Sequence, residues 1–185
     1  MTVIVVNSSS DVVADDGVCT LREAINSANT DSSPFATVGE CAAGSGTDQI
    51  TFDIGGPAAF TNGGQDGYRI SITSPLPTVV APVDINGFSQ PGALANTAPN
   101  PQPLNTRILV EVDGSSAGMT AGAGDNAFDF QPAAVGSSIS GLAIFNMGLG
   151  EAPTGSNDPT AIGVGAPDVT VAGVYLGTDH TGLVD

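Results

Sequence analysis

The sequence predicts an all-β fold, a right-handed parallel β-helix in which the chain coils into a solenoid, with a short N-terminal capping α-helix. A short pattern, apolar–x–apolar–x–Gly, occurs four times, with Ser in the first apolar position of the third copy, and its glycines lie 27, 27 and 32 residues apart. Near-constant spacing of this size is typical of repeat architectures. The alternation inside each copy indicates a strand with one buried face. Aromatic residues make up only 5% of the chain, which favours a narrow core of branched and small aliphatic side chains.

The four copies are expected to end where the chain turns, because glycine adopts positive φ at little cost. They span residues 83–87, 110–114, 137–141 and 169–173, which places the repeat turns at Gly87, Gly114, Gly141 and Gly173. Further strands are expected at 3–6, 50–54, 69–73, 126–130 and 142–145. Loops are expected at 55–67, 91–103 and 148–159, which are rich in Gly or Pro.

One helix is expected, over residues 21–28. Thr20 can cap its N-terminus, and Glu23 stands three residues later, which is the spacing of a capping box. The helix has one apolar face and is too short to be stable alone, so we expect it to lie across the open end of the solenoid. The residues of this structural cap are Thr20, Leu21, Arg22, Glu23, Ala24 and Ile25.

The chain is expected to form one continuous structural domain. Residues 1–65 would form an N-terminal cap, and residues 66–185 would form the first coils of the β-helix. Solenoids need a polar cap at each end. No closing pattern follows the last copy, so the β-helix is expected to be truncated at the C-terminus.

Charge limits the partners that the chain can have. It contains 19 acidic residues, three Arg and no Lys, and its net charge is −16. Nucleic acid is therefore excluded, because phosphate binding needs clustered cations. No run of about 18 apolar residues is present, so no membrane span is predicted.

Two cysteines, Cys19 and Cys41, can form a disulfide or stay as reduced buried thiols. Two thiols alone do not make a tetrahedral zinc site, and the single histidine, His180, is far away in the sequence. The composition is typical of extracellular proteins, in which disulfides persist, and it favours the disulfide. His180 itself is expected to be a solvent-exposed turn residue.

The segment Cys19-Thr20-Leu21-Arg22-Glu23-Ala24-Ile25 resembles the N-terminal C-S-L-R-E-A-I signature of bacterial surface and secreted proteins with parallel β-helix repeats, with Thr20 in the Ser position. The resemblance continues in residues 46–52, 76–78, 85–92 and 173–179. Chlamydial polymorphic outer-membrane proteins, which act as adhesins, are similar at a greater distance. The resemblance implies export and a large parent protein at the cell surface, and no catalytic residues come with it.

The expected function is therefore that of a non-catalytic structural or adhesive part of a large exported bacterial surface protein. Its partner would be an extracellular protein or a glycan, and its location the cell surface or the extracellular space. Two alternatives stay open. One is a carbohydrate-binding or polysaccharide-degrading module of the lyase or hydrolase type. The other is a subunit of an extracellular fibre that associates through the open end of the solenoid.

Metal binding is a secondary expectation, and no cofactor is required. Calcium prefers several carboxylate and carbonyl oxygens from flexible loops. Its weak candidate ligands are Asp11, Asp15 and Asp16 near the cap and Asp125 in a glycine-rich turn. Several pairs of carboxylates could lie close together, but 19 acids produce such pairs by chance, so no catalytic residue is predicted.

Overall fold

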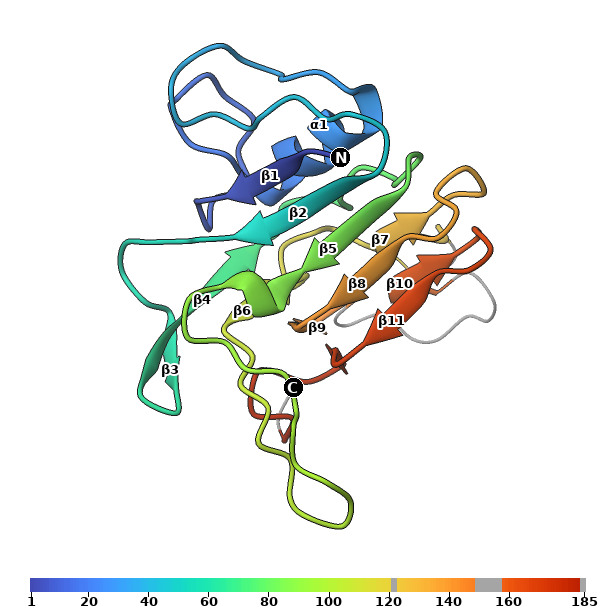
Figure 1. Ribbon diagram of the computed structural model, residues 1–185. Coiled ribbons are helices and arrows are strands. Elements are labelled where there is room, and N and C mark those ends of the chain that lie inside the picture. Colours follow the sequence, from blue (N-terminus) through green and yellow to red (C-terminus); the bar gives the residue numbers. More distant parts are fainter. Residues whose placement is uncertain (121–122, 149–157, 184–185) are drawn as a thin grey trace.

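A computed structural model of the chain describes residues 1–120, 123–148 and 158–183. These residues form twelve strands in three sheets, one α-helix and one short 3-10 helix (Figure 1). The first sheet is parallel throughout, in the order β1 (Val3–Val6), β2 (Asp48–Phe52), β5 (Val83–Asn86), β8 (Ser138–Ser140) and β11 (Thr170–Ala172).

The other two sheets are shorter or mixed. One has the order β12 (Tyr175–Leu176), β9 (Leu142–Phe145), β6 (Val110–Asp113), β4 (Gln65–Ser71) and β3 (Phe60–Asn62), with β3 and β4 antiparallel and the other pairs parallel. The remaining sheet pairs β7 (Asn126–Phe130) with β10 (Thr160–Val164) in parallel. The 3-10 helix η1 (Gly87–Ser89) follows β5.

The predicted all-β parallel β-helix is wrong. The described chain is a mixed α/β structure with a helix, parallel sheets and an antiparallel strand pair. The spacing that suggested a repeat is not a structural period, because the copy at 110–114 forms β6 in a different sheet from the other three copies. Within the first sheet, Asp84 pairs with Ser138, 54 residues further on, whereas Ser138 pairs with Thr170, only 32 residues further on.

The four glycines of the pattern also differ from one another. Gly141 and Gly173 have φ of 70° and 60°, in the left-handed region expected for a turn. Gly87 and Gly114 do not have positive φ. Glycine is needed there because a neighbouring atom occupies the place of a Cβ. A Cβ on Gly87 would lie 2.3 Å from the carbonyl oxygen of Gly141, and one on Gly114 would lie 2.4 Å from Sδ of Met147. Close approach therefore requires glycine at Gly87 and Gly114, and at Gly141 and Gly173 a positive φ requires it as well.

The segment expected to be a loop at 55–67 contains a β-hairpin. Gly63 and Gly64 connect β3 to β4, and their φ values of 57° and 77° suit a two-residue turn. The pair Gly63-Gly64 was a recognisable signal of a two-residue turn in the sequence. The proline-containing arm, residues 91–107, projects away from the sheets (Figure 1) and is closed at its base by an antiparallel bridge between Leu94 and Arg107. The loop expected at 148–159 lies largely outside the described residues.

The helix α1 (Leu21–Thr30) begins where its capping residues predict. Thr20 accepts a hydrogen bond from the Glu23 N–H, and the Glu23 carboxylate accepts one from the Thr20 N–H at 2.9 Å. Its buried face contacts β1 and β2, while Arg22 forms an ion pair with Asp11 at 2.8 Å. The disulfide between Cys19 and Cys41 is present, which confirms that part of the prediction.

Aligned columns of branched side chains fill the core. In the first sheet, register places Ile4, Ile50, Ile85, Ile139 and Val171 side by side across five strands. The first four are fully buried, and Val171 is half-exposed on the last strand. A second column in the mixed sheet runs through Ile70, Val112, Ile144 and Leu176. Because side chains alternate between the two faces of a strand, this register fixes which residues face outward.

Replacing Ile85 with Ala is expected to lower the free energy of unfolding by about 2–5 kcal/mol, because it leaves a cavity in the middle of the first column. Chemical denaturation measures the change. Val80 is 44% exposed, so Val80→Ala is a matched control that should change stability by about 0.5 kcal/mol or less. Equal losses in the two variants would contradict the position of Ile85 in the core.

Candidate functional site

A group of charged and polar side chains lies on the outer face of the mixed sheet. Arg69 on β4 and Glu111 on β6 are register partners, and Nε of Arg69 donates to Oε2 of Glu111 at 2.7 Å. Their neighbours Val110 and Val112 alternate with Glu111 and are buried in the core. The pair therefore follows from strand alternation and from the parallel register of β4 and β6.

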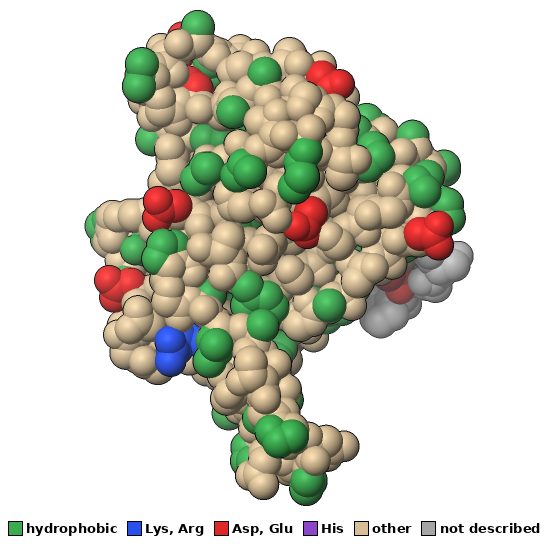
Figure 2. All heavy atoms as spheres, in the orientation of Figure 1, with side chains coloured by type: hydrophobic (Ala, Val, Ile, Leu, Met, Phe, Trp, Pro, Cys, Tyr) green, Lys and Arg blue, Asp and Glu red, His purple; other side chains and the backbone are tan. Residues whose placement is uncertain are grey.

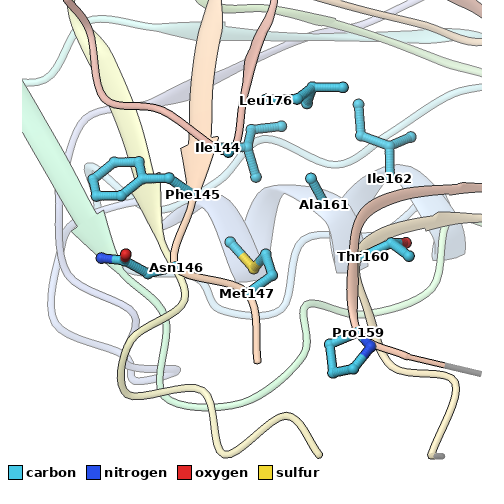
Figure 3. Close-up of a pocket in the computed structure, with 10 residues that line it drawn as sticks. Ile144, Phe145, Asn146, Met147, Pro159, Thr160, Ala161, Ile162 and Leu176 are labelled. Atoms are coloured by element: carbon cyan, nitrogen blue, oxygen red, sulfur yellow. The ribbon is translucent and has the colours of Figure 1, made fainter. Parts of the chain in front are cut away.

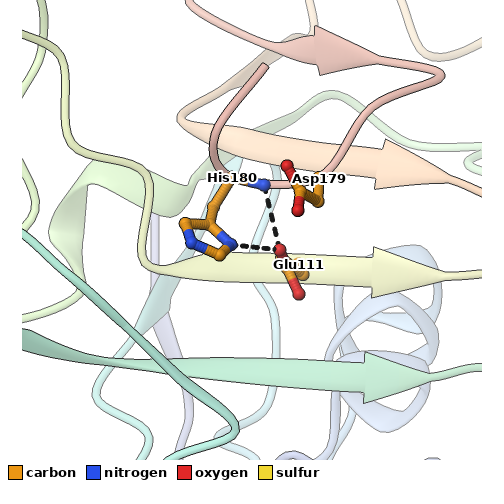
Figure 4. Close-up of side chains that lie close together, drawn as sticks. All are labelled: Glu111, Asp179 and His180. Carbon is orange, nitrogen blue, oxygen red and sulfur yellow. Dashed lines mark hydrogen bonds and ion pairs between the residues drawn. The ribbon is translucent and has the colours of Figure 1, made fainter. Parts of the chain in front are cut away.

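Glu111 is fully buried although it faces outward, because the segment 177–183 folds over it after β12. The next residue across the sheet is Ala143, whose small side chain leaves space above Glu111. His180 occupies this space and uses two groups to contact the carboxylate (Figure 4). Its backbone N–H donates to Oε1 at 2.9 Å, and its ring Nδ1 lies 2.7 Å from the same oxygen. Nδ1 donates to Glu111 when it carries the proton.

Aromatic rings contact both His180 and Arg69. The rings of Phe60 and His180 are stacked, with centroids 3.9 Å apart and an angle of 11° between the planes. The guanidinium of Arg69 lies over the ring of Phe145, 5.3 Å from its centroid, which is within the range of a cation–π contact. Gly67 permits the position of Phe60, because a Cβ at Gly67 would lie 2.1 Å from the ring.

Two further carboxylates flank this group. Burial opposes ionisation of Asp179, but hydrogen bonds from Thr181 and the charges of His180 and Arg69 together lower its pKa below the ordinary value. Burial likewise opposes ionisation of Asp113, but hydrogen bonds from Asn146 and Ser115 and the charge of Arg69 lower its pKa. Both carboxylates are therefore charged at neutral pH.

A pocket of about 420 Å³ is lined mainly by residues of β9 and β10 and their neighbours (Figure 3). Ile144, Met147, Ile162 and Leu176 supply much of its wall, and Phe145 and Asn146 connect it to the polar group. A second pocket, of about 350 Å³, lies at the base of the arm and is lined by Phe88, Tyr175 and residues of the arm. Neither pocket has an acid or an arginine among the described residues that line it.

The predicted calcium ligands do not come together. Asp11 binds Arg22 and accepts hydrogen bonds from Thr73, so its carboxylate already has partners. Asp15 and Asp16 are exposed, and Asp125 lies next to β7. In the described part of the chain, three metal-ligating side chains meet in one group only, which is Glu111, Asp179 and His180.

Sequence reasoning missed this group and placed His180 as an exposed turn residue. The side chain of His180 is only 14% exposed, and it contacts a residue 69 positions earlier. The available signal was weak: Arg69 and Glu111 are charged residues at outward positions of two predicted strands. Their pairing depends on the register between sheets, which alternation within a single strand does not determine.

No family model matches the chain, and no curated protein or solved structure was found to be similar to it. The resemblance to bacterial surface proteins therefore stays an expectation drawn from the motif around Cys19. Within the described residues, no helix has the length and apolar character needed to cross a membrane.

Replacing Asn146 with Gly is expected to raise the pKa of Asp113 towards its ordinary value, because a hydrogen bond to the carboxylate is lost. Glycine keeps the positive φ of 60° found at this position. A lowered carboxyl pKa stabilises the fold above the unfolded pKa of about 3.9, and this contribution disappears as pH falls through the folded pKa.

The difference in free energy of unfolding between the unchanged chain and the Asn146→Gly variant should therefore be largest at neutral pH and should shrink below about pH 4. Carboxyl NMR titration measures the pKa, and denaturation at both pH values measures the difference. The pKa of Asp113 in the Asn146→Gly variant must shift; an unchanged value would contradict the assigned cause.

Proposed function

We propose that this chain is a non-catalytic structural and adhesive part of an exported bacterial surface protein. The observation that carries this proposal is that the polar group on the mixed sheet bonds one part of the chain to another. Both carboxylate oxygens of Glu111 accept bonds from the protein itself, from Arg69 on one side and from His180 on the other. The group thereby fastens the segment 177–183 to the sheet, which is a structural task.

Charged and polar side chains also bond other loops to the rest of the chain. Asp48 is fully buried, and its carboxylate accepts hydrogen bonds from the N–H groups of Thr2 and Ser45. Arg22 binds Asp11 and also donates to the carbonyl oxygens of Ser74 and Pro75. In these two cases the charged side chains are bonded to neighbouring segments of the chain.

Location outside the cytoplasm is supported by chemistry. The disulfide between Cys19 and Cys41 is typical of oxidising compartments. Acidic side chains are scattered over the face shown in Figure 2, with a small basic patch near the base of the arm. The resemblance of residues 19–25 to surface-protein signatures points the same way.

A polysaccharide-degrading enzyme is supported less well. Glycoside hydrolysis needs two carboxylates about 5–10 Å apart with the sugar between them. Glu111 is fully buried beneath His180, and the described linings of both pockets hold no acid or arginine. A groove that combines acids, arginine and aromatic rings would have favoured the enzyme.

Incubation with acidic and neutral polysaccharides tests the absence of catalysis, and binding of the labelled chain to arrayed glycans and immobilised extracellular proteins tests adhesion. We expect no release of reducing sugar or of unsaturated products, together with saturable binding to at least one arrayed surface. Product release that His180→Phe abolishes would overturn the proposal. A chain that binds none of the surfaces would contradict its adhesive part.

Self-association is a second candidate function, and the last strand of each sheet favours it. β10, β11 and β12 each have a hydrogen-bonded strand on one side only among the described residues. Val164, Val171 and Leu176 on these strands are 55%, 43% and 51% exposed. Unpaired strand edges with apolar side chains are templates for pairing with another chain.

Static light scattering against protein concentration tests this second candidate. Association through these edges should raise the mean mass with concentration, and Val171→Lys should suppress the rise because charged edge residues oppose pairing. Val12→Lys, at an exposed position outside the strands, is the matched control and should behave as the unchanged chain. A constant monomer mass at all concentrations would exclude association.

A further inference from the structure

We propose that Glu111, Asp179 and His180 bind a late first-row divalent metal ion, of which Zn²⁺ is the representative case. The site is formed where the segment 177–183 lies on β6 (Figure 4). The ion would join two residues of this segment to a strand of the sheet. It would therefore fasten this segment to the sheet and keep a fourth position for water, which goes beyond the adhesive role proposed above.

The geometry is close to that of a metal site. Each of the three residues offers one ligand atom, and these atoms all lie within 4.8 Å of one another. Nδ1 of His180 and Oε1 of Glu111 are already only 2.7 Å apart. Zinc binds nitrogen and oxygen ligands at about 2.0–2.2 Å, so the ligands of one ion lie roughly 3–3.5 Å apart. The longest separation between ligand atoms, at most 4.8 Å, would have to shorten by roughly 1.5 Å when the ion binds.

The local charge favours a cation. Asp179 points towards Glu111 (Figure 4), and no hydrogen bond joins these two carboxylates in the described structure. Arg69 is the guanidinium beside them, and it lies near Asp113 as well as Glu111. Three carboxylates therefore gather around this guanidinium, in a chain whose net charge is −16.

The surroundings resemble those that orient metal ligands. Arg69 binds Oε2 of Glu111 and need not be displaced, whereas Oε1 would bind the ion with its second lone pair while it still accepts the backbone N–H of His180. Thr181 donates to Oδ1 of Asp179 from its backbone N–H at 2.8 Å, and Phe60 fixes the plane of the His180 ring. Partners of this kind position ligands and raise metal affinity.

The ligand types select the metal. An imidazole nitrogen beside two carboxylates suits zinc and its neighbours, whereas calcium and magnesium prefer oxygen ligands alone. The ion would take the place of the proton on Nδ1, because a ligating histidine must be neutral with that nitrogen free. Both cysteines are in the disulfide, and His180 is the only histidine, so thiols and other imidazoles do not compete.

Isothermal titration of the untagged, chelator-treated chain with ZnCl₂ tests the site. We expect one Zn²⁺ per chain and a higher melting temperature with the ion bound. His180→Phe keeps a ring to stack on Phe60 but removes the ligand, and Asp179→Asn removes a charge; each should weaken binding by about tenfold or more. His180→Phe removes one partner of the buried Glu111, whereas Asp179→Asn leaves all the bonds to Glu111 in place, so Asp179→Asn keeps the test valid if the first variant is less stable.

Asp66→Asn is the matched control, because it makes the same change of charge as Asp179→Asn at an exposed position on β4. It should bind Zn²⁺ as the unchanged chain does, and CaCl₂ should give no comparable heat or thermal shift. Binding should also weaken as pH falls and protons compete for the imidazole. An absence of Zn²⁺ binding, or affinity that His180→Phe leaves unchanged, would overturn the proposal whatever the outcome of the adhesion assays.

Discussion

The register between parallel strands is the constraint on which the rest of the molecule depends. Once Ile50 is aligned with Ile4 and Ile85, every residue between them is assigned to one face of the sheet. The same rule in the mixed sheet puts Val110 and Val112 inside and Glu111 outside, opposite Arg69. A shift of one residue would place the carboxylate in the core and expose the valines. Burial of the valines therefore determines where the polar group lies.

Burial of Glu111 has an energetic consequence for the segment that covers it. A carboxylate removed from water is costly unless charged or hydrogen-bonding groups compensate. Arg69 supplies one such group from the sheet, and His180 supplies two from the segment 177–183. The segment is thus held by the requirement to satisfy a buried charge as well as by its own packing. This explains how a short stretch with little regular structure can occupy one position.

Local features of the fold could be read from the sequence, and features that depend on distant contacts could not. Thr20 and Glu23 mark the start of the helix because capping depends on residues three apart. Alternation locates strands such as β7 and β9 for the same reason. The fold class failed because equal spacing of strand ends was taken as a repeat, although β6 belongs to another sheet. The polar group could not be predicted because residues 69, 111 and 180 meet only through the register between strands and through a segment that returns to the sheet.

The hairpin formed by β3 and β4 ties two distant parts of the chain together. Phe60 can lie flat across β4 only because Gly67 has no side chain, and the same ring supports His180 from the other end of the sequence. A methyl group at Gly67 would lift the ring and remove the surface against which the imidazole rests. Substitution of Gly67 is therefore restricted by His180, more than a hundred positions later, because Phe60 lies against both residues. Variation at these two positions should be correlated in evolution, with the phenylalanine as the intermediary.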